Sequence, residues 1–112
     1  MRGNHQSNRN IMSMDKTTAL EHAKRYARIV CKEVSPCKVF LFGSLVNGNF
    51  NENSDIDIAV VKDFLDDNYW ELTKTLNRLT RNIDNRIEPV LLQPKDNQSG
   101  FLYSVLKSGI EL

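Results

Sequence analysis

Apolar residues near the N-terminus recur at intervals of three or four, as one face of an α-helix requires: Leu20, Ala23, Ala27, Val30 and Val34. Asp15 precedes them as a suitable N-cap, so we predict an amphipathic helix that begins at Asp15 and ends near Pro36. Residues 1–13 are polar, asparagine-rich and aperiodic. They are predicted to form a disordered tail, which leaves residues 14–112 as the folded domain.

Two short segments after this helix have the pattern of β-strands. Residues 38–42, KVFLF, are apolar, rich in β-formers and stop at Gly43, which predicts a buried strand that leads into a turn. A second strand is predicted near residues 55–61, where apolar residues alternate with residues of the opposite face, two of them acidic. The segment between the two strands has the polar, glycine-containing composition of a turn.

The rest of the chain predicts a helix, a strand and a last short helix. Five residues repeat at helical spacing in the longer helix: Tyr69, Leu72, Leu76, Leu79 and Ile83. Residues 87–92 form the next apolar strand, and Pro89 within it predicts an edge or bulged strand. Gly109 is placed as the C-cap of the final helix. The element order is that of one small α/β (α+β) domain.

Composition narrows the function classes. The chain has 15 Lys and Arg against 14 Asp and Glu, and its net charge of +1 offers no broad attraction to nucleic acid or anionic membrane. Stable nucleic-acid binding is therefore not expected. No apolar run approaches the ~18 residues of a membrane span, and the N-terminus lacks a signal peptide's apolar region, so we expect a cytoplasmic protein. His5 and His22 have no evident partner in the pattern.

The candidate chemistry centres on two aspartates. Asp55 and Asp57 are two residues apart on a predicted strand, so both carboxylates point to one face and can share a cation. Mg²⁺ prefers such oxygen ligands and leaves positions open for substrate phosphates. Upstream, Gly43 and Ser44 directly follow a buried strand, where exposed N–H groups and a hydroxyl can hold phosphate oxygens. Gly48 and Ser54 in the same loop are further nucleotide-binding candidates.

In this order, the residues resemble a known sequence signature. The segment LFGSLVNGNFNENSDIDIAVV resembles the signature of the polymerase β-like nucleotidyltransferase superfamily: Gly-Ser, a short loop, then Asp-x-Asp on the next strand. The ending FLYSVLKSGIEL also looks like the last helix of the stand-alone minimal members, so the resemblance covers roughly residues 17–112. It implies the fold of that superfamily, a small mixed sheet of three to four strands flanked by helices.

The resemblance also implies an enzyme of the EC 2.7.7 type that uses two Mg²⁺ ions and ATP as the nucleotide donor. Asp55 and Asp57 would bridge both ions, and a third carboxylate on a later strand would complete one of them. Glu88 is the favoured third carboxylate and Asp84 the second choice. An acceptor hydroxyl would attack the α-phosphate and expel pyrophosphate, which leaves a nucleoside monophosphate, AMP from ATP, on the acceptor.

The partners implied by the resemblance are a nucleoside triphosphate and a protein. Minimal members resemble antitoxins that modify a small helical HEPN-type toxin, and a homodimer is also compatible with the sequence. One departure from the family motivates an alternative. Leu45 and Asn47 stand where many members carry phosphate-binding arginines. The chain could therefore be a weak or inactive nucleotidyltransferase-fold subunit that neutralises a partner by binding it.

Overall fold

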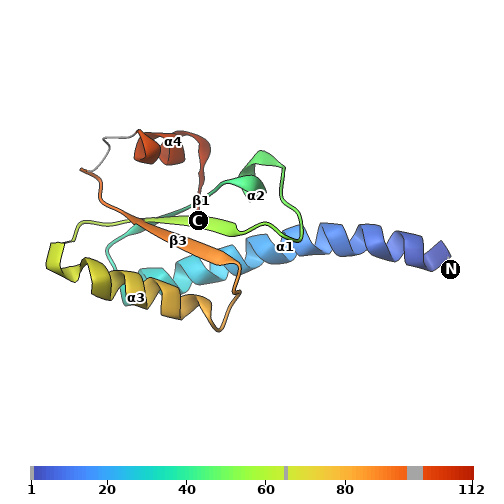
Figure 1. Ribbon diagram of the computed structural model, residues 1–112, viewed down its shortest axis with the longest axis horizontal. Helices are drawn as coiled ribbons and strands as arrows, with labels where there is room; N and C mark the ends of the chain where they lie inside the picture. The colour runs from blue at the N-terminus through green and yellow to red at the C-terminus, as the bar shows by residue number, and fades with distance from the viewer. Residues whose placement is uncertain (1, 65, 96–99) are drawn as a thin grey trace.

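The computed structural model describes residues 2–64, 66–95 and 100–112 (Figure 1). Its elements in chain order are α1 (Arg2–Glu33), β1 (Lys38–Phe42), α2 (Ser44–Asn47), β2 (Ile56–Val61), the 3-10 helix η1 (Asp66–Asn68), α3 (Tyr69–Thr80), β3 (Ile87–Leu92), α4 (Phe101–Ser108) and β4 (Ile110–Glu111).

The strands form one mixed sheet in the order β3-β2-β1-β4. Strand β1 is antiparallel to both β2 and β4, whereas β2 and β3 are parallel and connected through α3. Helices α1 and α3 lie on one face of the sheet and α4 lies on the other, while α2 follows the end of β1 (Figure 1). The predicted fold class, a small mixed sheet with flanking helices, is confirmed.

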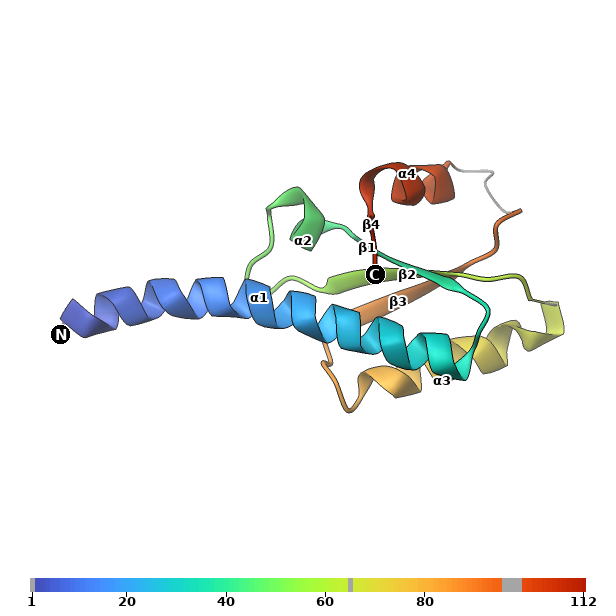
Figure 2. The same ribbon diagram turned by 180° about the vertical axis from the view of Figure 1, so that it is seen from behind.

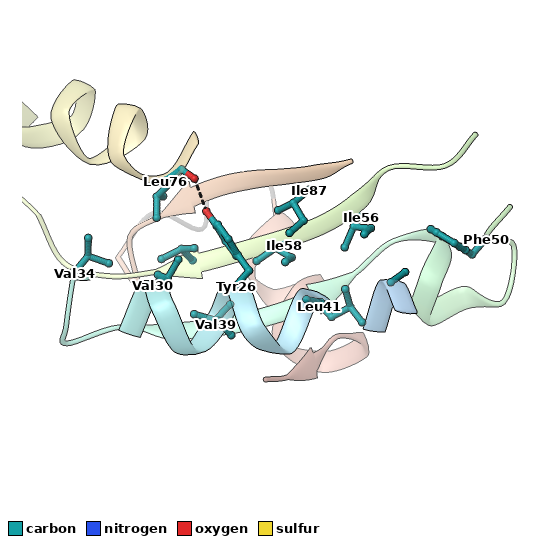
Figure 3. Close-up of a cluster of buried hydrophobic side chains, with 14 residues drawn as sticks. Tyr26, Val30, Val34, Val39, Leu41, Phe50, Ile56, Ile58, Leu76 and Ile87 are labelled. Atoms are coloured by element: carbon teal, nitrogen blue, oxygen red, sulfur yellow. Dashed lines mark hydrogen bonds between the residues drawn. The ribbon is translucent and has the colours of Figure 1, made fainter. Parts of the chain in front are cut away.

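The larger hydrophobic core fills the space between the sheet and the pair α1 and α3 (Figure 3). Strand β2 contributes Ile56, Ile58 and Val60, each with no exposed surface, because alternate residues of a strand face the same side. Tyr26 is the largest fully buried side chain, and its hydroxyl donates a 2.7 Å hydrogen bond to the Leu76 carbonyl of α3. Tyr26 therefore joins the two helices across the core.

Helix α1 is longer at its N-terminal end than the sequence pattern predicts. It begins at Arg2, so the backbone of residues 2–13 is helical where a disordered tail was expected, and it runs on beyond the sheet (Figure 2). A helix that is already nucleated by packing can propagate through residues that lack an apolar face, provided no proline interrupts them. Within the described ranges, no helix is both long and apolar enough to span a membrane.

The sequence predicted one edge strand of the sheet but not the other. Strand β3 is an edge strand, as Pro89 predicted, since proline has no N–H group to donate to a second neighbour. Strand β4 was not predicted, because two residues carry no detectable period.

Gly109 caps α4 as expected, with an ordinary φ of −78°. A Cβ there would lie 2.5 Å from the Val105 carbonyl oxygen, so glycine is required by this close approach.

A polar network ties α1 to the loop before β3. Arg86 donates through Nη1 to Asp15 at 3.1 Å and through Nη2 to Asp84 at 2.9 Å. His22 Nδ1 lies 2.9 Å from the second of these carboxylates, so the expectation that His22 lacks a partner is wrong. The contact spans 62 residues of chain and could not be read from sequence spacing. Burial opposes ionisation of Asp84, yet the bonds from Arg86 and His22 hold its pKa well below the ordinary range.

We predict that Tyr26→Phe lowers the free energy of unfolding by about 1 kcal/mol, because the ring stays buried while its hydrogen bond to Leu76 is lost. Urea unfolding followed by circular dichroism measures the change. Tyr69→Phe is the matched control, since Tyr69 is 38% exposed and should lose its hydroxyl without cost. Equal stability of the two variants would contradict the proposed role of the buried hydroxyl.

Asp84→Asn should lower the free energy of unfolding by about 2 kcal/mol at pH 7, as expected for hydrogen bonds to a charged group. Because the folded-state pKa of Asp84 is depressed, its stabilisation is complete above the unfolded pKa of about 3.9 and is lost as the pH falls through the folded value. The gap between wild type and variant should therefore shrink below pH ~4. Urea titrations across pH test this, with the exposed Glu52→Gln as control. A gap that stays constant or widens in acid would refute the assignment.

Candidate active site

Three predicted site residues, Gly43, Asp57 and Glu88, meet in one row across the sheet. Asp57 of β2 is the register partner of Phe42 on β1 and of Glu88 on β3. Gly43 immediately follows Phe42, so the β1 turn begins beside the Asp57 strand position. Sequence spacing alone predicted the pair Asp55 and Asp57. The parallel β2–β3 register is what places Glu88 beside them.

The carboxylates share one face of the sheet. Ala59 and Val61 of β2 pack in the smaller hydrophobic cluster with Leu102 of α4, and Asp55 and Asp57 have the same parity along the strand. On β3, Leu92 packs against this cluster and Glu88 shares its parity. All three acids therefore lie on the α4 face, beyond the end that the cluster covers. Asp55 and Glu88 are exposed, and Asp57 is half-buried.

Gly43 is in close contact with Asp57. The glycine has a φ of +80°, in the left-handed region, and a Cβ at this position would lie 2.1 Å from Asp57 Oδ2. A side chain would thus occupy the space that the carboxylate fills. The glycine of the Gly-Ser pair serves both the turn conformation and the approach of the turn to this aspartate.

The turn continues into the short helix α2, which the sequence pattern did not predict. Gly43 is its N-cap, and the Gly43 carbonyl accepts bonds from the N–H groups of Val46 and Asn47 at 3.1 and 3.0 Å. The first N–H groups of any helix have no partner within the helix. At α2 these belong to Ser44 and its neighbour, and they begin directly beside the Asp57 carboxylate. The arrangement is suited to holding a phosphate oxygen.

The electrostatics of the site favour a cation. Burial raises the pKa of Asp57, and the neighbouring charges of Asp55 and Glu88 raise it further. Across the described residues, no three His, Cys, Asp or Glu side chains are gathered as a complete protein metal centre would gather them. The donor type nevertheless fits Mg²⁺, which keeps water and substrate phosphate among its ligands and rarely takes a closed protein cage. Asp55, Asp57 and Glu88 could supply the protein's share.

Asp84, the second choice for the third carboxylate, does not join this row. Its side chain is only 9% exposed and is held by Arg86 and His22 on the side of the sheet where α1 packs. Glu88 is free of such bonds within the described part of the chain and faces the aspartate pair. Between the two alternatives, the fold thus favours Glu88.

Gly48 and Ser54 contribute to the conformation of the loop between β1 and β2. Gly48 ends α2 with a φ of +86°, which glycine adopts without strain. The Ser54 hydroxyl accepts a 3.0 Å bond from the Asn51 N–H and so helps close the turn before β2. Phe50 anchors the same loop, because its side chain is 5% exposed and belongs to the main core. Nucleotide contacts by Gly48 and Ser54 stay predictions.

A cavity of about 270 Å³ adjoins the Gly43 turn, and sequence reasoning did not anticipate its lining. One wall comes from the end of β1 and from α2, the other from α4. The lining residues are Phe42, Gly43, Val46, Asn47, Phe101, Ser104, Val105 and Ser108. The Phe42 and Phe101 rings meet edge to face with centroids 5.4 Å apart. The spacing of Ser104 and Ser108, one helical turn apart, was the signal available in the sequence.

The departure from the family's arginines has a structural consequence. Leu45 is partly buried and packs against the main core, and so does Val46. Asn47 is exposed and lines the cavity. The helix that follows Gly43 therefore contributes apolar packing at the position where the family resemblance leads us to expect an arginine.

Comparisons with known proteins identify the family and the fold. The family described as "Polymerase beta, Nucleotidyltransferase" matches residues 24–112, and the chain belongs to that family. A solved candidate nucleotidyltransferase is 28% identical, with a TM-score of 0.61, and the match covers 81% of this chain and 97% of the other.

A second structure, a candidate nucleotidyltransferase from Sulfolobus solfataricus, is 21% identical, with a TM-score of 0.60 and coverage of 86% and 80%. At that identity it supports the fold alone. No protein of curated function is significantly similar to the chain in sequence. The chain is therefore a minimal nucleotidyltransferase domain of the polymerase β-like superfamily.

Substitution of the two left-handed glycines tests the contact with Asp57. Gly43→Ala and Gly48→Ala should each cost about 1–2 kcal/mol for the left-handed backbone. Gly43→Ala should cost more, by about 1 kcal/mol or above, because its Cβ must displace the Asp57 carboxylate. A Cβ at Gly48 has no atom within 4 Å and isolates the backbone effect. Urea unfolding measures both variants, and equal losses would show that the contact imposes no constraint.

Proposed function

We propose that this domain is a Mg²⁺-dependent nucleotidyltransferase that transfers a nucleoside monophosphate, AMP from ATP, to a hydroxyl of a partner macromolecule. The observation that carries the proposal is the row formed by Gly43, Asp57 and Glu88. It brings the Gly43 turn, the predicted phosphate-binding segment, against the carboxylates of Asp57 and Glu88. Membership of the nucleotidyltransferase family supports the reaction class.

Each residue of the row has a role in the proposed reaction. Ser44 and the first N–H groups of α2 hold oxygens of the triphosphate beside Asp57. Asp55, Asp57 and Glu88 hold the metal, which when bound supplies positive charge to the phosphates and the acceptor oxygen. Glu88 stands at the exposed end of the row and orients the acceptor hydroxyl, whose proton it helps remove.

The sugar or base of the nucleotide would bind in the cavity between α2 and α4. It opens beside Gly43, and its volume of about 270 Å³ suits a sugar or base. Phe42 and Phe101 offer aromatic edges, while Ser104, Ser108 and Asn47 offer hydrogen-bonding groups. The choice of ATP follows from the family resemblance.

The proposed biological role is that of an antitoxin that modifies a HEPN-type toxin, and it rests on the resemblance to minimal family members. The alternative is a weak or inactive subunit that neutralises its partner by binding. Leu45 favours this alternative, because it packs in the core at the place of a phosphate-binding arginine.

Label transfer separates the two functions. The purified protein, α-labelled ATP and Mg²⁺ are incubated with the protein encoded beside it, and label on that partner is followed on denaturing gels. We expect transfer that falls at least about 100-fold in Asp55→Asn with Asp57→Asn and in Glu88→Gln, as when a charge-stabilising group of a transition state is removed.

Asp63→Asn is the matched control, because it removes the same charge near the opposite end of β2 and should leave transfer unchanged. Transfer that survives in the double variant would contradict the assigned site. A stable complex without transfer of any nucleotide would favour the binding subunit.

A further inference from the structure

A groove of about 580 Å³ lies on the side of the domain where α1 passes the β4 edge of the sheet. Helix α1 forms one wall and the C-terminal strand forms the other. The lining residues are Leu20, Lys24, Ala27, Arg28, Cys31, Lys32, Ile110, Glu111 and Leu112. None of them belongs to the carboxylate row or to the cavity beside Gly43.

The α1 wall carries a row of positive charge. Lys24, Arg28 and Lys32 are four residues apart, so they stand on one face of the helix along roughly 12 Å. All three are exposed, and the ion pairs found in the described part of the chain are made by other residues. Glu111 is the single acid among the lining residues. The row is thus largely unneutralised on a chain whose net charge is only +1.

The opposite wall is an unpaired sheet edge with an apolar side chain in the open. Among the described residues, strand β4 pairs with β1 alone, and the Leu112 N–H donates to the Val39 carbonyl of β1 at 2.8 Å. Backbone groups of successive residues in an antiparallel strand point to opposite sides, so those of Glu111 point away from the sheet. Ile110 is 50% exposed. An extended backbone can pair with the outward-facing N–H and carbonyl of Glu111.

We propose that this groove binds an extended acidic segment of another protein, which pairs with the free edge of β4. Its apolar side chains would cover Ile110 and Leu20, and its carboxylates would face Lys24, Arg28 and Lys32. Charge complementarity commits the occupant to an acidic segment, and the free edge commits it to an extended one. The inference does not depend on nucleotide transfer, since the carboxylate row lies on the other face of the sheet.

Two other occupants fit the groove less well. A second copy that used the same surface through a two-fold axis would bring its own basic row against this one, with only Glu111 of each copy to offset the repulsion. Nucleic acid would satisfy the charges but would leave the aliphatic side chains of Leu20, Ile110 and Leu112 against phosphate and sugar.

Binding of defined peptides to the full chain tests the proposal. The probes are two synthetic peptides of about six residues, one of alternating Glu and Val and one of alternating Lys and Val. We expect the acidic peptide to cause saturable amide shifts in ¹⁵N-labelled protein at residues 110–112 and along residues 20–32, and the basic peptide to cause none. Shifts that are absent, or that arise equally with both peptides, would overturn the proposal.

Charge-reversal variants locate the interaction. Lys24→Glu with Arg28→Glu and Lys32→Glu should weaken acidic-peptide binding at least about tenfold, as the loss of three exposed ion pairs predicts. Ile110→Asp should weaken it as well. Lys74→Glu with Arg78→Glu and Arg81→Glu reverses three exposed charges around α3 and should leave binding unchanged. Thermal unfolding confirms that each variant is folded.

The competing occupants give distinct results. Self-association in sedimentation that the α1 charge reversal abolishes would assign the groove to a second copy and overturn the proposal. Saturable binding of a single-stranded oligonucleotide at the same amides, in place of the acidic peptide, would overturn it too. Peptide binding that persists in Asp57→Asn would separate this surface from the site of the proposed transfer.

Discussion

The Asp57 carboxylate occupies the space where any other residue at position 43 would place its Cβ, and the rest of the site is built around that contact. It requires glycine in a left-handed conformation at the end of β1, which starts α2 beside the acid. It also requires β1 and β2 to be paired in one register, because a shift of one residue would turn Asp57 into the core. The register of β1 and β2 therefore also fixes the position of Asp57 in the site.

One face of the sheet carries the main hydrophobic core, and the other carries the candidate active site. On one face, α1 and α3 bury the isoleucines of β2, and Tyr26 and the Arg86 network fix these helices to each other and to the β3 loop. On the other face, α4 covers only the end of the sheet near Ala59 and Val61. The uncovered end can then hold charged side chains that a packed face would exclude.

Charge is used locally in this protein. A net charge of +1 conceals three separate arrangements: the acidic row at Asp57, the half-buried pairs around Arg86, and the basic row of Lys24, Arg28 and Lys32. Each lies on a different part of the surface, so a phosphate substrate with its cation and an acidic protein segment could be bound at the same time. Composition averages these fields away.

Periodicity and local spacing were enough to predict the elements with a strong repeat and the motif whose residues are close in sequence. These are the packed part of α1, the strands β1, β2 and β3, the edge position implied by Pro89, and the pairing of Asp55 with Asp57 on one face. Other features arise only when the elements pack together. The two-residue strand β4, the bond from His22 to Asp84 and the position of Glu88 beside Asp57 all depend on segments distant in the chain. Periodicity reports which way a side chain faces within its own element, whereas only the packing of elements decides which side chains from different elements meet.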